Sequence, residues 1–192
     1  MGKKALVFLA DGFEEVEAVT PIDYLRRSGV EVVIAAIGQS LSVKGSHGIA
    51  LTADTTIAAL NETETLNPAD WDCVFVPGGM PGSSNLAACV PVGNFFREMA
   101  KAGKTIAAIC AAPVVFLAPL GLLEGRKFTC YPGMEQGLTG CTEDRVVIDG
   151  NLITSRAAGT AAEFALALIE KLAGGDAAKK LKAATLLPGI DS

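Results

Sequence analysis

The sequence predicts a doubly wound α/β sandwich, in which helices cover both faces of a mostly parallel β-sheet. Short apolar runs alternate along the chain with amphipathic helical segments, and the joints between them are short. The chain has 192 residues, half of them hydrophobic, which is enough for an ample core. We therefore expect one domain over residues 1–192, without internal repeats or linkers.

The first elements form a strand–helix–strand unit. Residues 5–10 are a continuous apolar run, and a helix is expected from about residue 14 to residue 28, ended by Gly29. The next apolar run covers residues 30–37. A right-handed connection of this kind predicts that the two strands pair in parallel.

The same alternation continues through the rest of the chain. We predict strands at 73–77, 105–109 and 127–130, a short helical turn ending at Cys89, helices at 92–102, 111–120, 160–172 and 176–186, and a small β-hairpin at 145–155 that turns at Asp149 and Gly150.

Composition disfavours nucleic acid as a partner. The formal net charge is −5 and aromatic residues make up 6% of the chain, so no basic stripe or stacking platform is expected. We also expect no membrane span, because prolines and a glycine divide the uncharged stretch 105–123. Acidic residues follow the first strand where a secretory cleavage site would stand, and Leu6 occupies the position that myristoylation requires to be Ser or Thr.

The five cysteines are odd in number and include no C-x-x-C pair. We interpret them as free thiols in a reducing compartment, the cytoplasm. The only histidine is His47, so the sequence predicts no metal site, and the cysteine spacing offers no thiol cluster. The four cysteines other than Cys110 are interpreted as structural.

Three features follow predicted strands, where ligands bind in an open parallel sheet. They are the acidic segment 11–17, the pair Gly78-Gly79, and Cys110. If the three strands are neighbours, these features meet at one edge of the sheet. The two glycines leave backbone N–H groups free to approach an anion or an oxyanion, although a plain tight turn explains them equally well.

Cys110 lies at a strand-to-helix turn, where the helix dipole would favour the thiolate. The alternative is an inert buried thiol. Glu17 lies on a helical arc away from the charged residues Glu15, Asp23 and Arg26, so we expect a carboxyl group in semi-apolar surroundings with a raised pKa. The alternative is a solvated glutamate in the first turn of a helix.

Four sequence blocks resemble the ThiJ/PfpI superfamily and, within it, the Parkinsonism-associated deglycase branch. They are residues 5–17, 76–79, 107–113 and 152–160. The resemblance implies a flavodoxin-like sandwich that forms a homodimer, with Cys110 as the nucleophile and Glu17 protonated and hydrogen-bonded to its sulfur. The amides of Gly79 and Ala111 would be the oxyanion donors.

The resemblance also implies a reaction that needs no cofactor and no metal. Methylglyoxal or glyoxal would be converted to a hydroxyacid without glutathione, with deglycation of protein adducts and protection against oxidative stress as related roles. The alternative is a redox sensor or chaperone-like stress protein, in which Cys110 is oxidised to the sulfinate with little turnover.

Several positions depart from relatives of this superfamily. Ala111 stands where protease-like members have a histidine, which argues against a Cys–His peptidase. No histidine lies downstream of Cys110, which disfavours an amidotransferase-like hydrolase. Tyr131 stands where many members of the deglycase branch have a pocket histidine. His47, Arg27 and Arg156 match residues that the family places at the pocket or the dimer interface.

Overall fold

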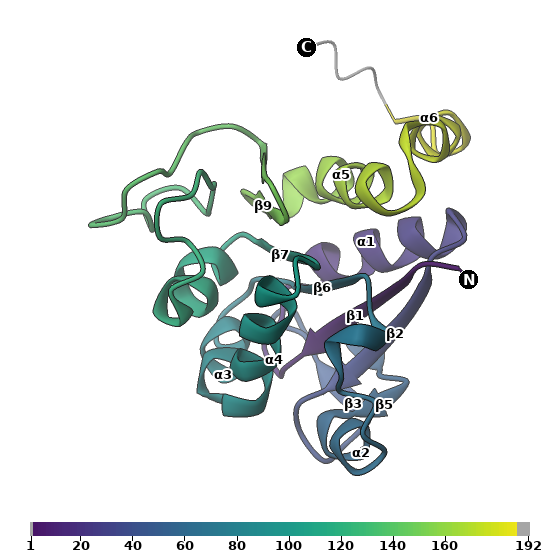
Figure 1. Cartoon of the computed structure of the whole chain (residues 1–192), viewed down its shortest axis with the longest axis vertical. Helices are drawn as coiled ribbons and strands as arrows, with labels where there is room; N and C mark the ends of the chain where they lie inside the picture. The colour runs from purple at the N-terminus through teal and green to yellow at the C-terminus, as the bar shows by residue number, and fades with distance from the viewer. Residues whose placement is uncertain (1, 188–192) are drawn as a thin grey trace.

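A computed structural model describes residues 2–187 and contains a seven-stranded, mostly parallel sheet (Figure 1). The strand order is β5-β2-β1-β6-β7-β9-β8, and every neighbouring pair is parallel except β8 and β9. The strands of this sheet are β1 (Lys4–Leu9), β2 (Glu31–Ala36), β5 (Thr55–Thr56), β6 (Cys73–Val76), β7 (Thr105–Ile109), β8 (Val146–Asp149) and β9 (Leu152–Ser155). A separate antiparallel pair is formed by β3 (Ser42–Lys44) and β4 (Ala50–Thr52).

Helices cover both faces of the sheet (Figure 1). The first face carries α1 (Glu15–Arg27) and α5 (Ala161–Ala173), with α6 (Gly175–Ala184) packed on α5. The second face carries α2 (Ile57–Glu62), α3 (Gly82–Ala88) and α4 (Val90–Lys101). Short 3-10 turns occupy Pro68–Asp70 and Ala158–Thr160. This arrangement confirms the predicted α/β sandwich.

Successive residues of each central strand point alternately into the two cores. Val7 and Phe75 lie in the core beneath α1 and α5, while Phe8 and Val76 lie in the core beneath α3 and α4. Because both faces are covered, β1, β6 and β7 are apolar along almost their whole length, which is typical of parallel strands. The continuous apolar runs in the sequence therefore indicate strands that are buried on both faces.

Most predicted elements are present, with ends shifted by a few residues. The hairpin turning at Asp149 and Gly150 is confirmed as β8 and β9. The structure adds elements that the sequence analysis did not predict, namely β3, β4, β5 and α2. Each is six residues or shorter, too short to show a clear hydrophobic period.

Two predicted elements differ from the structure. Residues 111–120 are helical as predicted, but they form a π-helical segment, Pro113–Leu117, and a 3-10 turn, Ala118–Leu120, in place of one α-helix. Pro119 has no N–H to donate within such a helix. Residues 127–130 are not a strand, and only an isolated bridge joins Phe128 to Cys141. The amide of Thr129 donates instead to the side chain of Thr154, at 2.9 Å.

Within residues 2–187, no helix combines the length and the apolar character that crossing a bilayer requires.

Candidate active site

The carboxyl ends of three adjacent strands bring the candidate residues together. β1, β6 and β7 are neighbours in the sheet. Glu17 follows β1 in the first turn of α1, Gly78 and Gly79 follow β6, and Cys110 follows β7 directly. The site therefore lies at the edge of the sheet where open α/β folds bind their ligands.

Cys110 occupies a sharp turn at the end of β7. Its φ of 66° lies in the left-handed region, which non-glycine residues rarely adopt. Two hydrogen bonds hold the turn: the Cys110 amide donates to the Ser155 carbonyl at 2.9 Å, and its carbonyl accepts from the Tyr131 amide at 2.8 Å. Strain of this kind is found where a fold holds a side chain in a set orientation, and here that side chain is a half-buried thiol.

Glu17 is buried, with only 1% of its surface exposed. Its Oε2 accepts a hydrogen bond from the Gly78 amide at 2.9 Å. The carboxyl group also faces the Cys110 thiol and the Ala158 amide. Burial raises the pKa of Glu17 to about 7, and these hydrogen bonds only partly offset the rise. A carboxyl group with this pKa can either hold or accept a proton at neutral pH.

Gly78 lets the thiol and the carboxyl group approach each other. A Cβ at this position would lie 2.7 Å from Cys110 Cβ and 2.7 Å from Glu17 Oε2. Both distances are shorter than van der Waals contact, so no other residue fits here without displacing one of the two groups. The next residue, Gly79, has a φ of 89°, and its amide N–H faces the Cys110 sulfur together with that of Ala111.

The Cys110 thiol differs from the sequence-based expectation. Burial and the adjacent Glu17 carboxylate raise its pKa to about 12, and the amides of Ala111 and Gly79 oppose this rise. The lowered pKa expected at a strand-to-helix turn is therefore not found. Protonation of Glu17 removes the repulsion from the sulfur, so the ionisation of each group depends on the other.

The remaining predicted site residues make contacts of other kinds. Tyr131 contacts the Cys110 turn through its backbone, while its side chain is half exposed. Arg156 donates to the Glu143 carbonyl at 2.7 Å. Arg27 lies in the last turn of α1, ten residues beyond Glu17 and hence about 15 Å along the helix axis. It pairs with Asp23, so within one chain it does not reach the thiol.

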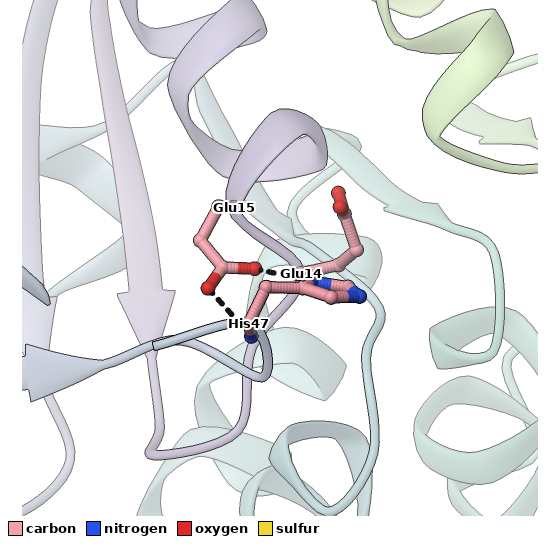
Figure 2. Close-up of side chains that lie close together, drawn as sticks. All are labelled: Glu14, Glu15 and His47. Atoms are coloured by element: carbon pink, nitrogen blue, oxygen red, sulfur yellow. Dashed lines mark hydrogen bonds and ion pairs between the residues drawn. The ribbon is translucent and has the colours of Figure 1, made fainter. Parts of the chain in front are cut away.

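His47 lies beside Glu15, a residue that helical periodicity groups with the charged residues of α1 (Figure 2). Glu15 is instead buried and accepts hydrogen bonds from the His47 amide at 2.7 Å and from His47 Nδ1 at 2.9 Å. Ile49 and Ser46 donate to the same carboxylate. Burial alone would raise the pKa of Glu15, but these donors hold it at about 2. Helical periodicity could not identify this role, because the donors come from a distant loop.

Glu14, Glu15 and His47 are the one group of three potential metal-ligating side chains that cluster within residues 2–187. Their donor atoms lie within 4.8 Å of one another (Figure 2). The Glu15 carboxylate already accepts from four donors of the protein, which occupies the lone pairs that a metal would need. We interpret this group as an ionic contact between α1 and the loop joining β3 to β4.

The chain is similar to known proteins over nearly its whole length. The model of the DJ-1/PfpI family matches residues 3–171. Protein DJ-1 homolog A of Arabidopsis thaliana is 42% identical over 184 residues, which cover 95% of this chain but 45% of the relative. This chain thus spans less than half the length of that relative.

Other relatives match along their full length. Glutathione-independent glyoxalase DJR-1.2 of Caenorhabditis elegans is 35% identical over 184 residues, covering 93% of this chain and 94% of the relative. The solved structure of oxidized Toxoplasma gondii DJ-1 superposes with a TM-score of 0.90 at 40% identity, covering 96% of this chain and 98% of that one. Together with the fold and the family match, these similarities lead to one conclusion: the chain belongs to the DJ-1/PfpI family.

Proposed function

We propose that this protein converts small reactive dicarbonyl compounds, methylglyoxal or glyoxal, into hydroxyacids through Cys110, without glutathione. One observation carries the proposal: the Cys110 thiol and the Glu17 carboxyl group both lie against Gly78. The carboxyl group is buried and its pKa is raised. A thiol and an acid–base group in contact are the minimum that addition to an aldehyde requires.

The first step is addition of the thiol to the aldehyde carbon. The sulfur–carbon bond forms while Glu17 takes the thiol proton, and the carbonyl π electrons move to oxygen. The amides of Gly79 and Ala111 face this region and would stabilise the resulting alkoxide. Glu17 returns its proton to the alkoxide, which gives a hemithioacetal on Cys110 and leaves Glu17 as a carboxylate.

The second step moves hydrogen between the two carbons. The Glu17 carboxylate removes the proton from the carbon bonded to sulfur and returns it to the neighbouring carbon. The hydroxyl proton passes to the neighbouring oxygen, which converts the hemithioacetal into a thioester. Water then attacks the thioester, releasing the hydroxyacid and restoring the thiol. One water is consumed, and no external oxidant or reductant is needed.

One relative supports this proposal through its name. The Caenorhabditis elegans relative is called a glutathione-independent glyoxalase, and it aligns over 93% of this chain. Protein deglycation would use the same addition step on a glycated adduct, so we propose it as a second substrate class of the same site.

The test measures lactate formation from methylglyoxal in the absence of glutathione. We expect Cys110→Ala to abolish turnover, because no nucleophile remains. Glu17→Gln should lower kcat by about 100-fold or more, since general acid–base catalysis contributes roughly that factor.

A matched control is Cys89→Ala, which removes another partly exposed thiol that is not in the site. It should retain wild-type turnover. Wild-type activity in the Cys110 variant, or in a folded Glu17→Gln variant, would rule out the mechanism.

A redox role is the second candidate function, and the same contact between sulfur and carboxyl group favours it. A carboxyl donor and two amides beside the sulfur would stabilise a sulfinate on Cys110. The Toxoplasma gondii DJ-1 structure is that of an oxidized protein. In this role Cys110 would sense or absorb oxidant and turn over little dicarbonyl.

Intact mass after mild peroxide treatment separates the two functions. A gain of two oxygen atoms confined to Cys110, with negligible lactate formation, supports the redox role. Rapid lactate formation by protein whose Cys110 stays reduced supports the enzyme.

We further propose that the protein is a homodimer in a reducing compartment such as the cytoplasm. Val16 and Val19 on α1 and Ile49 beside it are apolar and about half exposed, which is typical of surfaces that pair with another protein. Sedimentation of the wild type and of Val16→Lys would test this, and a monomeric wild type would contradict it.

A further inference from the structure

Two cysteines outside the candidate active site lie next to each other. The sequence spacing of Cys130 and Cys141 offered no thiol cluster, yet their Sγ atoms are 3.8 Å apart. A disulfide requires about 2.05 Å, so the sulfurs need to approach by about 1.8 Å.

The backbone around the two thiols holds them in place. The Phe128 amide donates to the Gly140 carbonyl at 3.0 Å, and the Thr142 amide donates to the Phe128 carbonyl at 2.8 Å. Thr129 Oγ1 donates to the Thr142 carbonyl at 3.0 Å. The segments 128–130 and 140–142 therefore run side by side, and the ten residues between the two cysteines form a closed loop.

Gly140 makes this close approach possible. Its φ is 88°, and a Cβ on it would collide with the Arg126 carbonyl oxygen. The glycine allows the 140–142 segment to lie directly against the 126–128 segment. The two cysteines are thus brought together by a specific backbone arrangement.

We propose that Cys130 and Cys141 form a redox-active dithiol, which hydrogen peroxide or an organic hydroperoxide oxidises to an intramolecular disulfide. This site is separate from the proposed chemistry of Cys110 and does not depend on it.

Exposure decides the order of the steps. Cys141 is half exposed, whereas Cys130 is buried, so the oxidant meets Cys141 first. The Cys141 thiol gives up its proton as its sulfur attacks one peroxide oxygen and the O–O bond breaks. The leaving hydroxide takes that proton, so a sulfenic acid and water result. Burial and the neighbouring Cys141 raise the pKa of Cys130 to about 12, which keeps Cys130 a protonated thiol during this step.

Cys130 then resolves the sulfenic acid. Its sulfur attacks the Cys141 sulfur, the S–O bond breaks, and the leaving hydroxide takes the Cys130 proton to form a second water. In total, two thiols and one hydrogen peroxide give one disulfide and two waters. A dithiol reductant such as dithiothreitol returns the disulfide to two thiols and is itself oxidised.

The disulfide would also restrain the candidate active site. Tyr131 directly follows Cys130, and its amide donates to the Cys110 carbonyl at 2.8 Å. A disulfide at Cys130 therefore fixes the segment that supports the Cys110 turn.

The test is peptide mapping of the whole native protein after graded hydrogen peroxide and alkylation. Trypsin cleaves after Lys127 and Arg145 and releases both cysteines on one peptide, 128–145. We expect this peptide to lose two hydrogen atoms and its alkylation sites, at a peroxide dose that leaves Cys89 alkylatable. Cleavage after Glu135 should then give two fragments that separate only on reduction.

Two variants sharpen the result. In Cys141→Ser, Cys130 should still be alkylated when the protein is denatured after peroxide treatment. Cys110→Ala should form the disulfide as the wild type does. The proposal is overturned if the wild-type peptide gains oxygen on cysteine instead, if both thiols stay alkylatable once Cys89 is oxidised, or if Cys130 links to Cys110. The wild-type map decides the question even if a variant does not fold.

Discussion

At the scale of single residues, the absence of a side chain at Gly78 determines the geometry of the site. The Glu17 carboxyl group accepts from the Gly78 amide. The Cys110 side chain also lies against Gly78, where any other residue would have its Cβ. A glycine in a buried turn is usually explained by its backbone freedom. Here the reason is volume, since Gly78 has no left-handed φ and its missing Cβ leaves room for two reactive groups.

Gly78→Ala should damage the site more than the fold. The added methyl group meets Cys110 Cβ, Glu17 Oε2 and the Ile109 carbonyl at 2.7 to 2.9 Å. We expect a loss of about 1–3 kcal/mol in unfolding free energy, as is common for overpacking. Displacing the reacting groups should lower kcat/KM for methylglyoxal about 100-fold.

Gly38→Ala is the matched control for this change, because no atom lies within 4 Å of its added Cβ. Urea unfolding and lactate formation measure the two effects. Wild-type turnover in Gly78→Ala would show that the contact between the thiol and the carboxyl group is not needed.

The raised pKa of Glu17 should make stability depend on pH. The folded state binds this proton more tightly than the unfolded state does, because the pKa rises from 4.5 to about 7. The stabilisation that this bound proton gives to the folded state is complete below pH 4.5, and it is lost as the pH rises through about 7. The shift corresponds to about 3 kcal/mol.

Urea unfolding of the wild type and of Glu17→Gln between pH 4.5 and 7.5 measures this loss. The difference between the two proteins isolates Glu17 from other titrating groups. A difference that does not change with pH would mean that the Glu17 pKa is ordinary.

At the scale of elements, the first turn of α1 combines three roles in four residues. Glu14 caps the helix by accepting from the Glu17 amide at 2.7 Å. Glu15 fixes the loop between β3 and β4, and Glu17 faces the thiol. All three acidic groups lie near the helix N-terminus, where the dipole stabilises negative charge.

Sequence periodicity separates only some of these roles. Periodicity places Glu17 away from the charged arc, because this inference depends only on positions within one helix. It groups Glu15 with the charged residues of the helix and does not reveal its burial, because the donors that surround Glu15 follow it by more than thirty residues. The same limit applies to Cys130 and Cys141, whose contact depends on how a loop returns to the sheet.

The contact of α1 with this loop can be tested through His47, the only histidine of the chain. The hydrogen bond that His47 Nδ1 donates to the Glu15 carboxylate, and the charge of that carboxylate, raise the pKa of His47 above 6.5. We expect proton NMR to give a His47 pKa above 6.5 in the wild type and a lower one in Glu15→Gln. The raised pKa adds stability below pH 6.5, which is lost as the pH rises through the folded-state value.

Glu31→Gln is a suitable control, because Glu31 forms an exposed ion pair with Lys4 that His47 does not share. It should leave the histidine titration unchanged. Identical His47 pKa values in the wild type and in Glu15→Gln would show that the contact does not form in solution.

At the scale of the whole molecule, two cores share one sheet. One contains Phe75 and Phe164, whose rings meet edge to face with centroids 6.0 Å apart. The other contains Phe96 and Phe116, with centroids 4.8 Å apart. The alternation of elements predicted helices on both faces of a parallel sheet. The strand order depends on contacts between distant segments, which periodicity does not encode.

This arrangement leads to a prediction about cooperativity over residues 1–192. Phe96→Leu and Phe164→Leu lie in different cores, so each should cost about 1 kcal/mol of unfolding free energy through lost packing. Because the two sites share no contacts, the costs should add to within about 0.5 kcal/mol in the double variant.

Unfolding should remain one transition in all three variants, since strands such as β1 and β6 belong to both cores. Urea titrations followed by circular dichroism and by the fluorescence of Trp71 measure this. Trp71 packs in the second core, so its signal reports that face alone, whereas circular dichroism reports both. If Phe164→Leu shifts the circular dichroism transition but leaves the Trp71 transition in place, the two faces unfold separately and the chain is not one cooperative domain.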